Sequence, residues 1–253
     1  MKTKRLLTLL LAVVLMLGIC ACGIGNGEES ASVEARKAEY QPGSYVTLGT
    51  YPQTESGNDS TPIEWLVLES DGKTALLISR YALDCQPYST ECISITWEKC
   101  TLRSWLNNEF YNRAFSAKEK ERILVSDVSA DKNPAYDRRN PGNATKDSIF
   151  LLSVAEANKY FASDEARMCA VTDYAIEQVV YYMDDDIDDD TVAEIENDYE
   201  VDGRIAWAWW LRTPGDLSSS AARVNEGGSI YDYGYYAGDS NLAVRPCVRV
   251  RLF

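Results

Sequence analysis

Side chains able to make specific contacts are most concentrated in residues 231–241, Tyr-Asp-Tyr-Gly-Tyr-Tyr-Ala-Gly-Asp-Ser-Asn. Tyrosine offers a large amphipathic face with few torsions, and aspartate, serine and asparagine add directional polar contacts. The candidate ligand-binding residues are Tyr231, Tyr233, Tyr235, Tyr236, Asp239 and Asn241. The other interpretation, which the residue pattern alone slightly favours, is a hairpin whose alternating tyrosines cover a sheet.

Two glutamates beside tryptophans indicate a second chemistry, the paired carboxylates of a glycoside hydrolase. Glu64 precedes Trp65, and Glu98 follows Trp97. Such catalysis needs two carboxyl groups roughly 5 to 9 Å apart in a cleft, a distance that a sequence does not supply. Because the chain has 39 acidic residues, such pairs arise by chance, and we assign no catalytic residue.

Composition excludes other chemistries. The chain has no histidine, which removes Ser-His-Asp and Cys-His catalysis and histidine-ligated zinc. Beyond the N-terminal region the cysteines are Cys85, Cys92, Cys100, Cys169 and Cys247. Their number is odd and no Cys-x-x-Cys occurs, so neither a structural zinc site nor a redox dithiol is expected. A disulfide between Cys85 and Cys92 and free or buried thiols are the open alternatives.

An acidic run, residues 184–190, follows a helix predicted over Asp173–Met183. Calcium binds clustered carboxylate oxygens, and the candidate ligands are Asp184, Asp186, Asp188 and Asp190. No register supplies the EF-hand glycine at the sixth position together with the glutamate at the twelfth. A solvated loop is therefore the preferred interpretation, calcium is the alternative, and no other cofactor is expected.

The N-terminus has the pattern of a bacterial export signal. A short basic start precedes an apolar run from Leu6 to Ile19, shorter than the roughly 20 residues of a permanent membrane span. Ala21 before Cys22 resembles a lipobox, in which a small residue precedes the lipidated cysteine. We therefore expect a signal peptide over residues 1–21, lipidation at Cys22 and a protein anchored to the cell membrane outside the cytoplasm. An ordinary signal peptide or an uncleaved anchor is the alternative.

The exported part is strongly acidic. The chain has a formal net charge of −14, and cleavage before Cys22 removes three basic and no acidic residues, leaving 22 basic against 39 acidic, or −17. Nucleic acid is not an expected partner, because phosphate binding needs a basic surface. Residues 22–40 have few large apolar side chains and predict a flexible tether. Residues 41–253 suit a single domain.

Local sequence patterns predict strands in both the N-terminal and the C-terminal part of the domain. Residues 45–49, 63–68 and 74–79 are β-rich, and the last two flank Asp71-Gly72, a hairpin signal. The C-terminal part, residues 206–253, returns to strands, the last of them predicted from Leu242 to Phe253.

The middle of the chain has helical patterns. Apolar residues at helical spacing begin near Thr101. Capping boxes at Ser116 and Ser153 predict two further helices, the first continuing through Leu124. Residues 131–147, rich in Asn, Pro, Gly and charge, predict a long surface loop.

Six phrases occur in order along the chain, beginning at Leu48, Ile63, Leu76, Leu102, Trp209 and Val244. They include Leu-Arg-Ser-Trp-Leu-Asn, Trp-Trp-Leu-Arg-Thr-Pro-Gly and Val-Arg-Pro-Cys. Together they resemble a family of exported bacterial domains of undefined function, whose last third looks like the C-type-lectin-like fold of formylglycine-generating enzymes. The resemblance implies an α+β fold of short antiparallel sheets, a few helices and long loops.

The motif residues are Trp209, Trp210, Arg212, Pro214, Gly215, Arg245 and Pro246. We interpret them as structural. The tryptophans fill the core, Arg212 pairs with a buried carboxylate or carbonyl near Arg245, and Pro246 belongs at a sheet edge or bulge.

The resemblance indicates where in the domain function would lie, but it does not indicate an enzymatic activity. Formylglycine-generating enzymes use a cysteine pair near their C-terminus to bind copper and activate oxygen, whereas only Cys247 lies in about the last 80 residues here. In the lectin-like fold, function resides in the C-terminal loops, which correspond to residues 216–241.

The preferred hypothesis is a lipid-anchored, non-catalytic binding domain that presents residues 231–241 to a carbohydrate or protein ligand. The first alternative is an extracellular enzyme, either a carboxylate glycan hydrolase or a cysteine-dependent oxidase. The second is a structural cell-envelope protein whose acidic segment binds cations.

Overall fold

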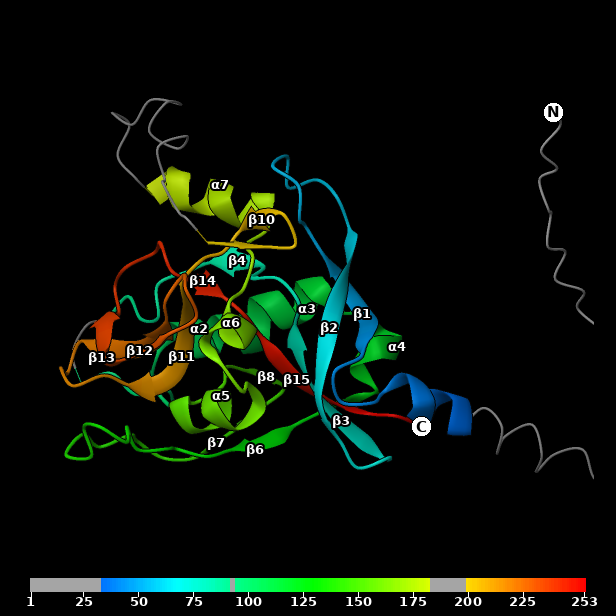
Figure 1. Ribbon diagram of the computed structural model, residues 1–253, viewed down its shortest axis with the longest axis horizontal. Coiled ribbons are helices and arrows are strands. Elements are labelled where there is room, and N and C mark those ends of the chain that lie inside the picture. The colour runs from blue at the N-terminus through cyan, green and yellow to red at the C-terminus, as the bar shows by residue number, and fades with distance from the viewer. Residues whose placement is uncertain (1–32, 92–93, 183–198) are drawn as a thin grey trace, which may run out of the picture.

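The computed structural model describes residues 33–91, 94–182 and 199–253 and has a mixed α+β architecture of mostly antiparallel sheets (Figure 1). Cys22 lies outside these ranges, as do the candidate calcium ligands in residues 184–190. In the part described, no helix is long and apolar enough to cross a membrane. The expected α+β class is therefore observed.

A six-stranded sheet lies on the right of Figure 1, with the order β1-β2-β3-β15-β5 and with β8 also paired to β15. Its strands are β1 (Tyr45–Tyr51), β2 (Thr61–Ser70), β3 (Thr74–Ser79), β5 (Ile123–Leu124), β8 (Ile149–Phe150) and β15 (Cys247–Arg251). The β2–β3 hairpin turns at Asp71-Gly72 as predicted. Gly72 has φ +77°, and the Asp71 carboxylate accepts hydrogen bonds from the backbone N–H groups of Lys73 and Thr74.

A five-stranded sheet, β13-β12-β11-β14-β4, lies on the left, with β13 at its edge. Its strands are β4 (Asp84–Cys85), β11 (Trp209–Pro214), β12 (Ser220–Val224), β13 (Ile230–Tyr236) and β14 (Ala243–Val244). The single strand predicted from Leu242 to Phe253 is divided, since β14 belongs to this sheet and β15 to the other. The break falls at Arg245-Pro246, because proline has no N–H for a strand ladder.

The helices are α2 (Thr101–Trp105), the π-helix η1 (Leu106–Phe110), α3 (Tyr111–Ala114), α4 (Ala117–Lys120), α5 (Val154–Tyr160), α6 (Asp164–Arg167) and α7 (Asp173–Tyr182). Both predicted capping boxes form, at Ser116 and Ser153. The prediction that the first helix continues through Leu124 is wrong. α4 ends at Lys120, because Ile123 and Leu124 pair with β15 as strand β5.

Two small sheets complete the fold. β6 (Ser126–Val128) pairs with β7 (Thr145–Asp147), and β9 (Glu200–Val201) pairs with β10 (Arg204–Ile205). The long loop predicted over residues 131–147 therefore ends before β7, and it is called here the 129–144 loop. Residues 33–39, predicted as part of the flexible tether, are helical, and Arg36 donates to the Leu252 carbonyl (2.7 Å).

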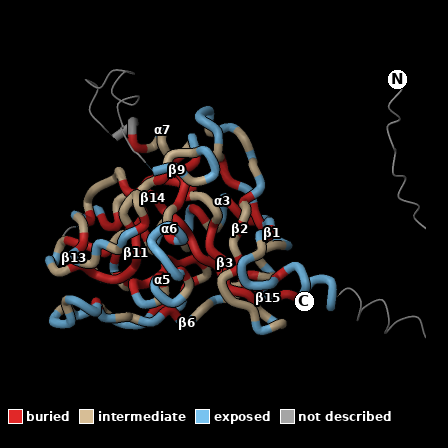
Figure 2. Tube along the Cα trace, viewed as in Figure 1, coloured by how far each residue is buried: buried red, intermediate tan, exposed pale blue. Residues whose placement is uncertain are grey.

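A hydrophobic core joins both sheets, as the buried segments in Figure 2 show. Trp65, Trp209 and Trp210 are fully buried. Each indole N–H donates to a backbone carbonyl, so the large apolar faces pack without leaving a buried donor unpaired.

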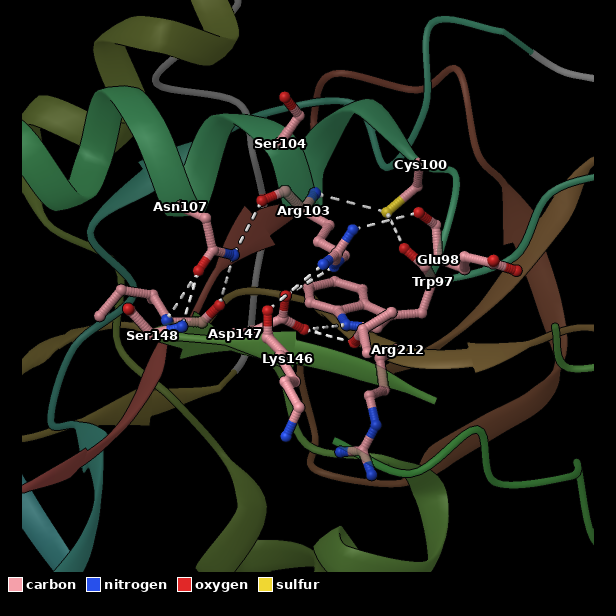
Figure 3. A network of polar contacts seen from close by, with 12 residues as sticks. Trp97, Glu98, Cys100, Arg103, Ser104, Asn107, Lys146, Asp147, Ser148 and Arg212 are labelled. Carbon is pink, nitrogen blue, oxygen red and sulfur yellow. Dashed lines mark hydrogen bonds and ion pairs between the residues drawn. The ribbon is translucent and has the colours of Figure 1, made fainter. Parts of the chain in front are cut away.

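A buried carboxylate fastens α2 to β7 (Figure 3). Asp147, only 1% exposed, accepts from Trp97 Nε1 (2.9 Å), Arg103 Nε (2.6 Å) and Thr145 Oγ1 (2.6 Å). Because a buried charge is costly unless it is paired and hydrogen-bonded, these three donors hold the start of α2 against the sheet.

One turn further along, Asn107 makes a second connection (Figure 3). Its Oδ1 accepts from the N–H groups of Ser148 and Ile149 (2.8 and 3.2 Å). Its Nδ2 donates to the carbonyls of Arg103 and Ile149 (3.0 and 2.9 Å). The Leu-Arg-Ser-Trp-Leu-Asn phrase thus contains both polar connections between this helical segment and the strands.

Asn107→Ala should lower the free energy of unfolding by about 2 kcal/mol, because it leaves the N–H groups of Ser148 and Ile149 without their acceptor. Asn108→Ala is the matched control. It removes an exposed contact to the Ser104 carbonyl and should cost about 0.5 kcal/mol or less. Chemical denaturation of both variants measures the difference, and equal losses would contradict the role given to Asn107.

Candidate ligand-binding site

Three tyrosine rings form a row at the edge of the five-stranded sheet, called here the tyrosine shelf. Tyr231 and Tyr233 alternate along β13, are 40% and 39% exposed, and have ring centroids 6.2 Å apart. Tyr136, from the 129–144 loop, packs edge-on against Tyr233 with centroids 5.7 Å apart. The shelf therefore joins two segments that are distant in sequence.

Arg223 lies beside the shelf on β12, opposite Tyr231 in the strand register. Its guanidinium carbon is 4.1 Å from the ring centroid of Tyr235 and 5.7 Å from that of Tyr231. Cation–π attraction of this kind holds the charge in place. The buried Nε of Arg223 has no hydrogen-bond partner among the described residues.

One buried asparagine sets the geometry of the shelf. Asn133, 0% exposed, donates through Nδ2 to the carbonyls of Pro214 and Asp232 (2.8 and 2.7 Å). Its Oδ1 accepts from the N–H groups of Ala135 and Tyr136 (3.0 and 3.2 Å). Asn133 thereby ties the segment that carries Tyr136 to the edge strand and to the turn after β11.

Two glycines allow that turn to approach β13 closely. A Cβ on Gly215 would lie 2.5 Å from the Tyr233 carbonyl oxygen, and one on Gly234 would lie 2.6 Å from the Cα of Gly215. The Asp216 N–H then donates to the Tyr233 carbonyl (2.7 Å). The glycine of the Pro-Gly motif is explained by this contact, since any side chain would separate the two segments.

A polar pocket of about 470 Å³, called here the turn pocket, adjoins the same turn. Its walls come from residues 94–99, 139–143 and 214–218. Lys99 and Arg139 supply positive charge, and Glu98 is the one carboxylate among the described lining residues. Arg139 Nε donates to the Asp216 carbonyl, and the Asp216 N–H binds Tyr233, so the pocket and the shelf share one turn.

The remaining predicted ligand-binding residues lie apart from the shelf's row of rings. Tyr235 is half-buried and contacts Arg223, whereas Tyr236 is 55% exposed. Asp239 accepts from the Asn241 N–H (2.7 Å), and the Asn241 carbonyl accepts from an indole N–H (2.6 Å). These last two residues therefore order the turn after β13.

Tyr136, Arg223 and the turn pocket were missed by sequence reasoning. The signal that could have indicated Tyr136 is the length of its loop, because long ordered loops often carry function. Nothing local marks Arg223, whose position depends on the pairing of β12 with β13.

The two glutamates considered as a catalytic pair have separate partners. Glu64, on β2, forms an ion pair with Arg80 (2.9 Å). Glu98 accepts from the side chain and the N–H of Asn143, and these hydrogen bonds lower the pKa of its carboxyl. The turn pocket thus holds one described carboxylate, whereas glycoside hydrolysis generally uses two.

The described cysteines, Cys85, Cys100, Cys169 and Cys247, are free and buried. Burial raises the pKa of each thiol, that of Cys100 to about 12. Cys85 could have formed a disulfide with Cys92 or remained a free thiol, and in the structure it is a free thiol. Since the thiolate is the reactive form, these buried thiols are poorly suited to chemistry. Within the described ranges, no group of three histidine, cysteine, aspartate or glutamate side chains could hold a metal ion.

The motif arginines make structural contacts. Arg212, whose side chain is 2% exposed, forms ion pairs with Asp131 (3.0 Å) and Glu156. The Arg245 guanidinium lies over the Trp209 ring, 5.1 Å from its centroid, and donates to a backbone carbonyl. Each guanidinium is thereby satisfied inside the domain.

Residues 72–252 match a family model described as a domain of unknown function, DUF6273. The chain belongs to this family. No curated protein and no solved structure matches the chain. The DUF6273 region includes the whole tyrosine shelf and all the residues that line the turn pocket, so the candidate site lies within the family domain.

The DUF6273 domain also buries a carboxylate on β4. Asp84, 2% exposed, accepts from the Tyr51 hydroxyl (2.6 Å) and from Gln86 Nε2 (3.1 Å). Burial raises the pKa of its carboxyl to about 6, although both hydrogen bonds favour the charged form. Asp84 is therefore a titrating group of the fold.

Asp84→Asn should change how stability depends on pH. The pKa of the wild-type carboxyl is about 4 in the unfolded chain and about 6 in the folded protein. Its contribution to the free energy of unfolding is therefore complete at low pH and is lost as the pH rises between these two values. Asp84→Asn lacks this loss. The difference in unfolding free energy, variant minus wild type, should therefore increase by about 2 kcal/mol between pH 4 and pH 7. Denaturant titrations across this range test the prediction, which parallel curves for the two proteins would refute.

Proposed function

We propose that this DUF6273 protein is a non-catalytic binding domain that holds a carbohydrate on the tyrosine shelf and in the turn pocket. The observation that carries the proposal is the row of Tyr136, Tyr231 and Tyr233, of which the last two are exposed. The row is continuous through one turn with a polar pocket.

The chemistry of the site favours a sugar. Aromatic rings bury the C–H faces of a pyranose, while nearby polar groups pair with its hydroxyls. Tyr233 is already packed against both neighbouring rings, and Asn133 fixes the segment that supplies Tyr136. Such preorganisation reduces the entropy lost when a ligand binds.

The non-catalytic interpretation is supported against both enzymatic alternatives. A carboxylate hydrolase needs a second acidic group facing Glu98, and the described lining of the turn pocket has none. A cysteine-dependent oxidase needs accessible thiolates, and the four described cysteines are buried with raised pKa values.

The anchor and the finer fold are parts of the same proposal. The N-terminal pattern supports cleavage before Cys22, which would place the domain on the outer side of the cell membrane. A C-type-lectin-like arrangement of the last third is supported by the six sequence phrases and by the antiparallel unit β11–β12–β13.

The tyrosine shelf is tested by the double variant Tyr231→Ala/Tyr233→Ala. We expect the wild-type chain to bind cell-wall oligosaccharides on a glycan array, and the double variant to bind the best of them roughly tenfold or more weakly, because two stacking faces are lost. Calorimetric titration of that oligosaccharide gives the affinities.

Tyr45→Ala is the matched control for this test, since Tyr45 is 50% exposed but lies on β1 in the other sheet. Its affinity should equal that of the wild type. Capture of an envelope protein through Tyr233, with no glycan bound, would refute the carbohydrate assignment.

Lipidation is tested by Cys22→Ser. The variant should lose incorporation of a labelled fatty acid and should leave the membrane fraction, because its acceptor thiol is gone. Cys20→Ser is the control and should keep both properties. Unchanged labelling of Cys22→Ser would show that the anchor lies elsewhere.

A further inference from the structure

One wall of the turn pocket carries an arginine side chain. Arg139 lines the pocket and uses Nε to bind the Asp216 carbonyl. Its Nη1 and Nη2 have no protein partner among the described residues. The two terminal nitrogens of a guanidinium form a planar fork that matches the two oxygens of a carboxylate.

The other groups of the pocket set the charge that it can accept. Thr96 Oγ1 is buried and has no hydrogen-bond partner among the described residues. Lys99 adds a second cation, and Glu98, already bound to Asn143, is the one described carboxylate. Two positive groups and one negative group suit one monoanion better than a phosphate monoester, which carries nearly two negative charges at neutral pH.

We propose that the turn pocket binds the carboxylate of an acidic sugar, with Arg139 as the group that recognises it. The inference rests on the proposed carbohydrate function and names its ligand class: a uronic-acid-containing oligosaccharide. The backbone of Asp216 contacts both Arg139 and Tyr233, so the pocket and the shelf adjoin each other. The sugar carboxylate would therefore enter the pocket while the rest of the oligosaccharide stacks on the shelf.

The experiment compares two matched ligands on the full chain in mild detergent. One is an oligogalacturonate, and the other is the same oligosaccharide after reduction of its carboxylates to primary alcohols. Calorimetry at low salt should show that the oligogalacturonate binds roughly tenfold or more tightly than its reduced form, as expected for a charge-assisted bidentate contact. Arg139→Gln should abolish this preference, because the acidic form loses roughly tenfold or more in affinity beyond any loss shared with the reduced sugar.

Arg138→Gln provides the matched control, because Arg138 is exposed and adjacent but does not line the pocket. It should keep the preference. Arg139→Lys should keep only part of it, since lysine supplies the charge without the fork. Equal wild-type affinity for both sugars, or equal losses in Arg138→Gln and Arg139→Gln, would overturn the inference.

The outcomes separate the inference from the proposed function. Binding of both sugars without preference, lost in Tyr231→Ala/Tyr233→Ala, overturns the acidic-sugar site alone. An Arg139-dependent preference that survives in the tyrosine variant, with unchanged binding of the reduced sugar, overturns the shelf and supports the anion site. Equally tight, Arg139-dependent binding of hexaglutamate would overturn the sugar assignment in favour of an acidic peptide.

Discussion

The buried guanidinium of Arg212 is the constraint on which the candidate site depends. Removing such a charge from water costs several kcal/mol unless partners surround it, and Arg212 meets this requirement with Asp131 and Glu156. Asp131 lies near the start of the 129–144 loop and Glu156 in the first turn of α5. The ion pairs therefore fix where this otherwise irregular loop leaves the core.

The position of the shelf follows from that anchor in a few steps. Two residues after Asp131, the side chain of Asn133 is buried and donates to the carbonyls of Pro214 and Asp232. Tyr136 is then held against Tyr233, and the Arg139 N–H in turn donates to the Tyr136 carbonyl. A motif arginine that is remote from solvent thus acts on the candidate site by fixing the loop that supplies Tyr136 and Arg139.

Features that depend on local chemistry were predictable from the sequence. The Asp71-Gly72 turn and the two capping boxes involve hydrogen bonds within a few residues, so they appear where the pattern indicates. The end of α4 at Lys120 was not predictable, since Ile123 is recruited by β15 from the other end of the chain. In such cases tertiary pairing overrides local propensity.

The same distinction applies to the candidate site. Composition pointed to the tyrosines of β13, because their clustering is visible in eleven consecutive residues. Tyr136 and Arg223 join them only through Asn133 and through the β12–β13 pairing. The cationic character of the turn pocket was hidden for a related reason. In a chain of net charge −14, the local balance around Arg139 emerges only when three separate segments meet.

The edge position of β13 bears on how a ligand would be recognised. An exposed edge strand offers unpaired backbone groups and invites pairing with another strand. Here the carbonyls of Asp232 and Tyr233 already accept from Asn133 and from the Asp216 N–H, and Gly234 has φ +89°, which departs from strand geometry. Backbone pairing along this edge is therefore obstructed, whereas the rings of Tyr231 and Tyr233 remain exposed. Under the proposed function, recognition at this edge would fall to side-chain faces, which suits a ligand that presents C–H surfaces and hydroxyls rather than a peptide strand.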